Sequence, residues 1–359
     1  MDSFRPQSLI RILSWTPISK FSQSPWYSEG SSIFGSCRFD PPLKCEYTHD
    51  RSLLLVSDAV IFRGMMLDQA LPSRRLAHQK WVLFESKPPR LVLTNLSAHS
   101  EVFNLTSTFS MDSDVPLPMQ RKCTPVKGQN NVRSYPGENF AIKKSRMLAW
   151  INVNHCATPS RREYYVQDLR KHVDVHIYGQ CGEYRCRDGM HKCLRRIAPK
   201  YKFILAFENA LCSDYITDAL WSIFDNRLKV VPIVLGAADY SSVLPEGTYI
   251  DVRNFTSPRA LAKYLKYLDR HPDQYNGFIN RRNFDVCSLK TDYSQYHCAL
   301  CKHLHEYRGV SEVALNVATF WGRKRRCQKP TRFYKKIAPK MIKANTSLNL
   351  WGDPSWRMY

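Results

Sequence analysis

Short apolar runs alternate with amphipathic segments between residues 146 and 271, and this alternation limits the folds open to the chain more than any other feature. The segments between the apolar runs carry helix signals at 160–172, at about 213–225 and at 257–271. The runs themselves are RMLAWINV, VDVHIY, KFILAF, KVVPIVLG and TYIDV. Strands that alternate with helices predict a parallel sheet joined by right-handed crossovers. We therefore expect an α/β fold.

The chain is long enough for two domains, because its 359 residues exceed the usual length of one. Upstream, RSLLLVSDAVIF and WVLFES repeat the pattern of apolar strands that end in polar loops. We expect a first domain over 36–140 and a second over 141–325, joined by the polar segment 121–145. Residues 1–35 are rich in Ser and Pro and lack periodicity, which predicts a disordered or truncated N-terminal segment. Residues 326–359 form a predicted basic tail.

The charge balance favours an anionic partner. Lys and Arg number 53 against 31 Asp and Glu, which gives a formal net charge of +22. Such an excess suits nucleic acid, an acidic membrane face or a phosphorylated small molecule, and also an ordinary basic enzyme. Residues 323–343 carry basic side chains and no acid. That run matches a nucleic-acid pattern, but no nucleic-acid-binding module accompanies it. We interpret it as a solvated tail and expect no nucleic-acid partner.

The cysteines predict disulfides rather than zinc. The chain has 12 cysteines, an even number, and clustered cysteines imply either metal binding or an oxidising compartment. Only one CxxC unit is present, Cys298-Ala-Leu-Cys301, and no second ligand pair stands at zinc-finger spacing although His303 and His305 follow. Bridging is therefore favoured, and Cys298 and Cys301 could pair with each other or with other cysteines.

Glycosylation sequons point to the secretory pathway. The four acceptors are Asn95, Asn104, Asn254 and Asn345, and such motifs lie on the surface of secreted proteins. No signal peptide or run of about 18 apolar residues is visible in the sequence. Either the chain lacks its native N-terminus or the lumenal interpretation is wrong, and our hypothesis is a lumenal protein whose N-terminus is truncated or alternative.

Two strand–turn–helix units carry the candidate chemistry. Ser160 and Glu163 have the spacing of a capping box, which places Arg162 in the opening turn of a helix. A helix N-terminus attracts anions, and an arginine there can bind phosphate in a paired fashion; an ordinary surface arginine is the alternative.

The second unit is FENALCSDYITDALW, residues 207–221. Asn209 stands where a strand ends, at the edge where open α/β sheets bind ligands. If Ser213 or Asp214 caps the following helix, then Asp214, Asp218 and Trp221 share one face, with Tyr215 on another. Acids at such a place can accept hydrogen bonds from sugar hydroxyls. A capped helix start without a ligand is the alternative.

These motifs, in this order, resemble the α1,3-fucosyltransferase family, glycosyltransferase family 10. Its signature is FEN…DYVTEK followed by a VPVVLG-like strand. The resemblance covers about residues 45–325 and takes in CATPSRREYYVQDL, WVLFES, FNLTSTF, DSDVPLP and CALCKHLHE. YGQCGEYRC resembles the invertebrate members most.

The resemblance implies a GT-B architecture of two Rossmann-like domains facing a cleft, with the acceptor side in 36–140 and the GDP-fucose side in 141–325. It implies inverting transfer of fucose from GDP-fucose to GlcNAc of a glycoprotein or glycolipid, in α1,3 linkage, without a cofactor or metal. Asp112-Ser113-Asp114 would then be structural, and Cys298 and Cys301 would form structural disulfides. The family consists of Golgi type II membrane proteins, although no anchor is visible here.

Site residues follow by position in the family motifs. Glu85 matches the catalytic general base, and Arg162 matches the arginine on the diphosphate. Asn209 and Tyr215 match donor-binding positions, and Asp218 replaces a donor-binding Glu.

Several positions depart from the family pattern. Ala219 stands where the family has the lysine that contacts the diphosphate. Such a charge commonly stabilises the leaving group by about 3 kcal/mol. Arg227 and Lys229 are cations that could replace it, although neither shares its helical face. Ser222 replaces an Asn. Lys87 replaces the Pro of the family's ESP motif, and Phe109-Ser110-Met111 replaces an Arg-rich segment. The alternative to an active enzyme is a degenerate member that binds glycan or nucleotide without turnover.

Overall fold

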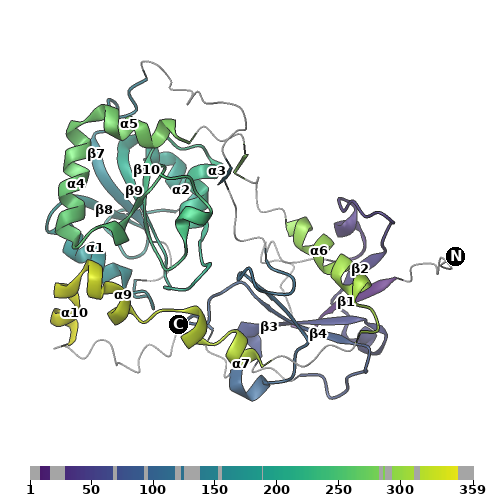
Figure 1. The fold of residues 1–359 in the computed structure, drawn as a ribbon. Coiled ribbons are helices and arrows are strands. Elements are labelled where there is room, and N and C mark those ends of the chain that lie inside the picture. The colour runs from purple at the N-terminus through teal and green to yellow at the C-terminus, as the bar shows by residue number, and fades with distance from the viewer. Residues whose placement is uncertain are drawn as a thin grey trace. The chain divides into compact units, whose positions relative to one another are not determined.

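The computed structural model of the chain describes residues 9–16, 29–67, 71–92, 96–117, 123–124, 138–152, 156–187, 189–282, 286–287, 293–310 and 316–346 (Figure 1). It divides into two compact units. Unit 1 comprises residues 1–119 and 291–326, and unit 2 comprises residues 120–290 and 327–359. The expected boundary near 140 therefore lies about twenty residues earlier, and a late segment that we assigned to the second domain returns to unit 1.

Unit 1 is built on a parallel sheet of five strands in the order β2-β1-β3-β4-β5. The strands are β1 (Ile10–Ser14), β2 (Cys45–Thr48), β3 (Ala59–Arg63), β4 (Lys80–Glu85) and β5 (Leu105–Thr108). Helix α6 (Tyr293–Glu306) packs on the sheet through Tyr296, Leu300 and Leu304. The α/β fold that we predicted is confirmed for this unit.

The first strand corrects the prediction for residues 1–35. Ile10–Ser14 is not a loop but lies between β2 and β3 in the sheet. Ile12 and Leu13 are fully buried there. Strand pairing on both sides satisfies the backbone of a five-residue segment that is too short to show a period in the sequence.

Unit 2 holds a second parallel sheet, in the order β11-β10-β9-β7-β8. Its strands are β7 (Arg146–Ile151), β8 (Val175–Tyr178), β9 (Tyr201–Phe207), β10 (Val231–Leu235) and β11 (Ile250–Asp251). The helices that follow them are α1 (Arg162–Arg170), α2 (Gly189–Ile197), α3 (Asp218–Asp225), α4 (Pro258–Arg270) and α5 (Pro272–Asn280). A small antiparallel pair, β6 (Cys123–Thr124) with β12 (Val286–Cys287), lies outside this sheet.

Both faces of the unit 2 sheet are covered, because successive strand side chains point to opposite faces. Leu148 and Trp150 of β7 join one core with α1, α4 and α5. Ala149 joins the other core with α2 and α3. Figure 1 shows these two groups of helices on opposite sides of the sheet.

Short 3₁₀ helices fill many of the connections: η2 (Ser32–Phe34), η3 (Arg51–Val56), η4 (Gly64–Met66), η5 (Leu96–His99), η6 (Ala198–Lys200), η7 (Tyr240–Ser242) and η8 (Val252–Asn254). In the part of the chain that the structure describes, no helix has both the length and the apolar character needed to cross a membrane.

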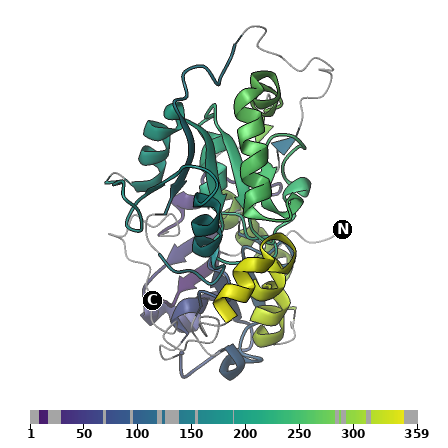
Figure 2. The same ribbon diagram turned by 90° about the vertical axis from the view of Figure 1, so that its left-hand side faces the viewer.

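The basic C-terminal segment is folded as far as Thr346, which corrects the prediction of a solvated tail for this part, and residues 347–359 lie outside the described residues. It forms α7 (Val317–Phe320) and α8 (Arg323–Arg326) in unit 1, then α9 (Pro330–Ile337) and α10 (Pro339–Thr346) in unit 2. The last two are the yellow helices of Figure 2. Apolar side chains between the lysines enter the core that contains α1: Phe333, Tyr334, Ile337 and Met341. Lys335, Lys336 and Lys340 thus occupy the exposed faces of amphipathic helices.

Disulfides join segments that are far apart in the sequence. The bridges between described residues are Cys37–Cys298, Cys45–Cys301, Cys156–Cys181, Cys186–Cys193 and Cys212–Cys327, and no cysteine in the described part of the chain is free. Cys298 and Cys301 do not pair with each other, because both lie one turn apart on α6 and face two different N-terminal segments. Disulfides rather than zinc thiolates are therefore confirmed for this CxxC unit.

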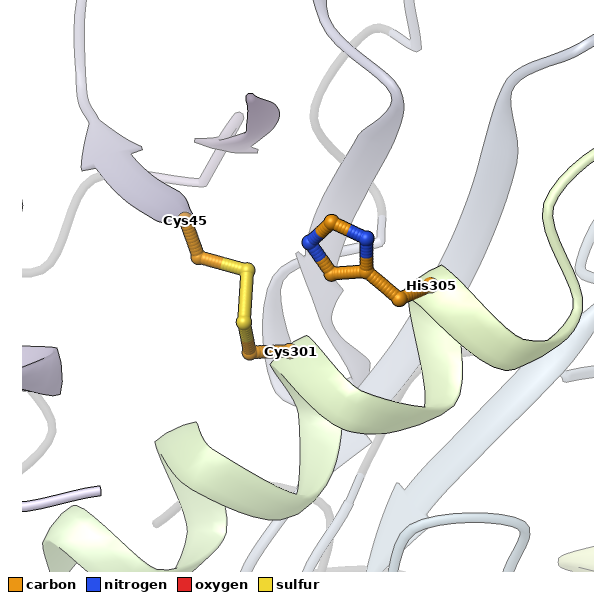
Figure 3. Close-up of side chains that lie close together, drawn as sticks. All are labelled: Cys45, Cys301 and His305. Atoms are coloured by element: carbon orange, nitrogen blue, oxygen red, sulfur yellow. A yellow bond between two sulfur atoms is a disulfide. The ribbon is translucent and has the colours of Figure 1, made fainter. Parts of the chain in front are cut away.

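One group of side chains has the spacing of a metal site. Cys45, Cys301 and His305 place their ligand atoms within 4.8 Å of one another. Figure 3 shows that the two sulfur atoms are bonded to each other. His305 Nε2 lies 3.1 Å from the Lys44 carbonyl oxygen. Zinc binds cysteine as the thiolate, and these two cysteines are oxidised to a disulfide. The Cys45–Cys301 bridge therefore acts as a structural cross-link within unit 1.

If α9 is folded as described, Ile337→Ala will destabilise the protein by about 2–4 kcal/mol, because it removes a buried side chain from the core. The measurement is the free energy of unfolding in denaturant. Lys336→Ala, its exposed neighbour, is the control and should change stability by less than about 0.5 kcal/mol. Equal stabilities of the two variants would mean that the segment is solvated.

Candidate active site

Unit 2 presents polar side chains where β7 and β9 end. The chain passes from β7 outward to β8 and then returns to β9 on the other side of β7. The crossovers from these two neighbours therefore leave in opposite directions, and ligands of open α/β sheets bind at such a switch point. Asn152 follows β7, and Glu208 and Asn209 follow β9.

Arg162 connects the two strand ends. Its Nη2 donates to Asn152 Oδ1 at 3.1 Å, and its Nη1 donates to the Phe207 carbonyl. The guanidinium also lies 5.4 Å from the Trp150 ring. The side chain is buried, and burial lowers its pKa while the nearby carboxylates of Glu208 and Glu163 oppose that change. The alternative of an ordinary surface arginine is therefore wrong.

The local backbone explains how Arg162 enters the crevice. Helix α1 begins at Arg162, after Arg161 in the left-handed conformation with φ of 58°. The predicted capping box does not form, because Glu163 accepts from the backbone and hydroxyl of Thr158, at 3.2 and 3.0 Å, rather than from Ser160. Ser160 N–H instead donates to the Asn209 carbonyl at 3.0 Å. This hydrogen bond joins the residues that precede α1 to the turn after β9.

Glu208 is a buried carboxylate at the centre of the cluster. Its Oε1 accepts from Thr217 N–H at 2.8 Å, and its Oε2 has no hydrogen-bond partner among the described residues. Burial raises the pKa of Glu208 to about 7, although the hydrogen bonds from Thr217 and the charge of Arg162 oppose that shift. The residue is thus poised to change charge near neutral pH.

Several further polar atoms in this region lack a partner. Within the described residues, buried Arg162 Nε, Asn209 Oδ1 and the Tyr240 hydroxyl make no hydrogen bond. A Cβ on Gly236, at the end of β10, would collide with the Tyr240 hydroxyl and come within 3.1 Å of Glu208 Cγ. Unpaired buried polar groups are rare in native proteins. Their concentration at a switch point indicates that a polar ligand completes the site.

Tyr215 and the start of α3 differ from the prediction. The helix begins at Asp218 with Thr217 as its N-cap, whose hydroxyl accepts from Ala219 N–H at 3.3 Å. Asp214 precedes the helix in the left-handed conformation, so neither it nor Ser213 caps α3, and Asp214 shares no helical face with Asp218. Tyr215 is buried, which raises its pKa, while a hydrogen bond from Asn209 opposes the shift.

Glu85 belongs to unit 1, at the end of β4. It is buried, with Oε2 accepting from Met65 N–H and Oε1 from Lys87 N–H, both at 2.7 Å. Burial raises the pKa of Glu85, and the two backbone bonds together with Arg63 and Lys87 counteract the increase. Gly64 makes room for it, since a Cβ there would lie 3.1 Å from the carboxylate.

The two carboxylates of Asp112-Ser113-Asp114 are bound by protein donors. Asp112 accepts from Arg326 at 2.7–2.8 Å, and Arg325 is 3.4 Å away. Asp114 accepts from the backbone and hydroxyl of Thr106, at 2.8 and 2.6 Å. This arrangement suits a structural segment.

The sequons differ in accessibility. Asn254 lies exposed in η8. Asn104 Oδ1 accepts from Trp81 N–H at 3.0 Å and from Arg75. Asn95 and the side chain of Asn345 lie outside the described residues.

The structure thus gathers Arg162, Asn209, Tyr215 and the start of α3 in unit 2, and it places Glu85 in unit 1. Sequence reasoning missed His191, on α2, whose Nδ1 lies 2.8 Å from Ser222 Oγ. No local pattern marks a residue that reaches the site from a neighbouring helix. Sequence reasoning did not assign Glu208 to the site either, although the F-E-N motif after an apolar strand contains this residue.

Two family models match the chain. "Fucosyltransferase, N-terminal" matches residues 7–120, and "Glycosyltransferase family 10 (fucosyltransferase) C-term" matches residues 141–320.

Three relatives have been named for their activities. The alpha-(1,3)-fucosyltransferase C of Drosophila melanogaster is 31% identical over 84% of this chain and 74% of its own. The 4-galactosyl-N-acetylglucosaminide 3-alpha-L-fucosyltransferase 9 of Mus musculus is 32% identical over 77% of this chain and 75% of its own. The GDP-fucose protein O-fucosyltransferase 3 of Xenopus tropicalis is 33% identical over 79% of this chain and 66% of its own.

A solved structure has the same fold. A crystal structure of an alpha1,3-fucosyltransferase superposes with a TM-score of 0.55 at 14% identity, covering 88% of this chain and 94% of the other. At that identity the likeness supports the fold alone.

Glu208→Gln should remove a pH dependence of stability. The pKa of this carboxyl is about 7 in the folded protein against 4.5 for the ordinary group, so the unfolded chain loses the proton first as pH rises. Wild type should therefore lose up to about 3 kcal/mol of stability, relative to the variant, between about pH 4.5 and pH 7. Free energies of unfolding measured across this range provide the test. Exposed Glu246→Gln is the control, and parallel profiles for wild type and Glu208→Gln would contradict the prediction.

Proposed function

The chain belongs to glycosyltransferase family 10, the fucosyltransferases, and from this premise we propose that it transfers fucose from GDP-fucose to GlcNAc of a glycoprotein or glycolipid glycan, in α1,3 linkage. One observation carries the donor half of the proposal: the unpartnered buried polar atoms beside Arg162, at the switch point of the unit 2 sheet. Their donors and acceptors suit a charged and hydroxyl-rich ligand.

In this proposal Arg162 holds the diphosphate of GDP-fucose. Its Nη atoms are fixed by Asn152 and the Phe207 carbonyl, so Nε, which makes no hydrogen bond among the described residues, remains for a ligand. A guanidinium fixed in this way loses little side-chain entropy on binding. Asn209 and Tyr215 contact the donor beside it, and Asp218 accepts from the donor's hydroxyl groups.

Glu85 is the proposed general base. The acceptor hydroxyl oxygen attacks the anomeric carbon of fucose, the bond from that carbon to the diphosphate oxygen breaks, and GDP leaves with the bonding electrons. The hydroxyl proton passes to the Glu85 carboxylate. Attack from the face opposite the leaving group inverts the anomeric centre. The reaction needs one carboxylate that is ionised near neutral pH and whose pKa is raised toward that value. In this proposal the transfer requires no metal or other cofactor.

We place the reaction in the Golgi lumen. The five disulfides between described residues need an oxidising compartment to form, and the exposed Asn254 sequon is available to the glycosylation machinery of that pathway. The anchor that the family resemblance implies forms part of the same proposal.

Glu85→Gln should reduce kcat by about 10²–10⁴-fold, because it removes the base, while GDP affinity stays at the wild-type value. The assay is fucose transfer to a panel of GlcNAc glycans and Ser- or Thr-containing peptides, with protein from an oxidising host. The matched control is Glu306→Gln, an exposed acid paired with Lys302, which should retain full activity.

The acceptor panel separates the candidates. Transfer to GlcNAc supports the proposal, and transfer to peptide hydroxyls would assign the chain the acceptor class in the name of its Xenopus relative. GDP binding without transfer to any acceptor would establish the degenerate, binding-only alternative.

Lys87 should set the acidic limb of the pH–rate profile. The base acts only when ionised, so the rate falls as pH drops through the raised pKa of Glu85. Lys87→Ala removes a charge that lowers this pKa, and Lys87→Pro also removes the N–H bonded to Oε1. The acidic limb of kcat/KM should therefore move to higher pH in the order wild type, Lys87→Ala, Lys87→Pro. Identical limbs in all three would exclude Glu85 as the titrating base.

A further inference from the structure

His191 of α2 lies against the first turns of α3. Its Nδ1 is 2.8 Å from Ser222 Oγ, and its Nε2 is 3.8 Å from Asp218 Oδ2. The imidazole is 58% exposed. It therefore sits on the solvent side of α3, whose other face is buried through Leu220 and Ile223.

The contacts of His191 fix which nitrogen can meet a ligand. The Ser222 hydroxyl occupies Nδ1. The Asp218 carboxylate, 3.8 Å from Nε2, is too far away for a hydrogen bond. Neither contact occupies Nε2, which donates a hydrogen bond at the beginning of α3 whenever it carries a proton.

The start of α3 needs a positive charge nearby if it is to bind an anion. Two carboxylates already stand there, Asp218 in the first turn and Glu208 on the N–H of Thr217. Ala219 contributes no charge. Arg227 and Lys229 follow the last residue of α3, so they lie at the opposite end of the helix. Among the described residues, His191 brings a basic side chain to this turn through its contacts with Ser222 and Asp218.

We propose that His191 binds the diphosphate of the nucleotide-sugar donor, supplying from α2 the charge and hydrogen bond that Ala219 of α3 lacks. The inference rests on the proposed donor site. It also gives a joint explanation for two departures from the family pattern: Ala219 leaves the helix start without its cation, and Ser222 holds the imidazole that replaces it.

Binding of GDP and of guanosine to the full chain tests the proposal, because only GDP carries the diphosphate. His191→Gln keeps a polar side chain beside Ser222 but cannot carry charge. It should lower GDP affinity by about 10–100-fold, the range for a hydrogen bond to a charged group, and leave guanosine affinity unchanged. His191→Lys should retain GDP affinity within a few-fold.

A second variant places the charge back on α3. Ala219→Lys in the His191→Gln background should recover most of the lost GDP affinity. Exposed His78→Gln in unit 1 is the matched control and should leave both affinities unchanged.

The outcomes separate the inference from the function on which it rests. If wild type binds GDP and His191→Gln binds it equally well, the role of His191 is overturned and the donor site stands. Equal losses for GDP and guanosine would mean that His191 only supports the fold. If wild type does not bind GDP, the donor site itself is overturned, and the role of His191 with it.

Discussion

The buried guanidinium of Arg162 is the interaction on which the organisation of unit 2 depends. A charged group out of water is costly unless it is hydrogen-bonded and paired. Asn152 and the Phe207 carbonyl satisfy its two Nη atoms from the ends of two neighbouring strands, and Glu208 provides opposite charge. One side chain thereby ties the switch point together and keeps part of its hydrogen-bonding capacity for a ligand.

The C-terminal segment supports this arrangement through contacts with the residues that precede α1 and with the turn after β9. The Tyr334 hydroxyl of α9 donates to the Ser160 carbonyl at 2.8 Å, two residues before Arg162. Cys327, just before α9, bridges to Cys212 in the turn that carries Asn209 and Tyr215, and Gln328 N–H donates to the Leu211 carbonyl at 2.7 Å. A segment whose composition indicates a solvated tail thus holds both turns of the candidate site, because its apolar side chains are spaced to enter a core.

Departures from the family motifs coincide with contacts that this chain makes at the same places. Lys87 stands where the family has proline, and its N–H, which a proline lacks, donates to Glu85. Ser222 and Ala219 stand where the family has Asn and Lys, and His191 contacts the first and lies within a turn of the second. A missing side chain in one helix therefore does not by itself mean a missing interaction, since neighbouring elements can supply the same chemistry.

The sequence by itself determined the class of fold and indicated where a candidate site lies. Alternating apolar and amphipathic segments predicted parallel sheets, the polar residues after KFILAF marked the ligand-binding edge, and the cysteine pattern favoured disulfides. These are local signals, carried by residues within one strand, turn or helix. Tertiary structure alone decided that Ile10–Ser14 is a sheet strand, that Cys298 and Cys301 bridge to Cys37 and Cys45, that α3 begins at Asp218 and that His191 reaches it. Each of these depends on contacts between segments distant along the chain, whose burial and hydrogen bonding override the local preference.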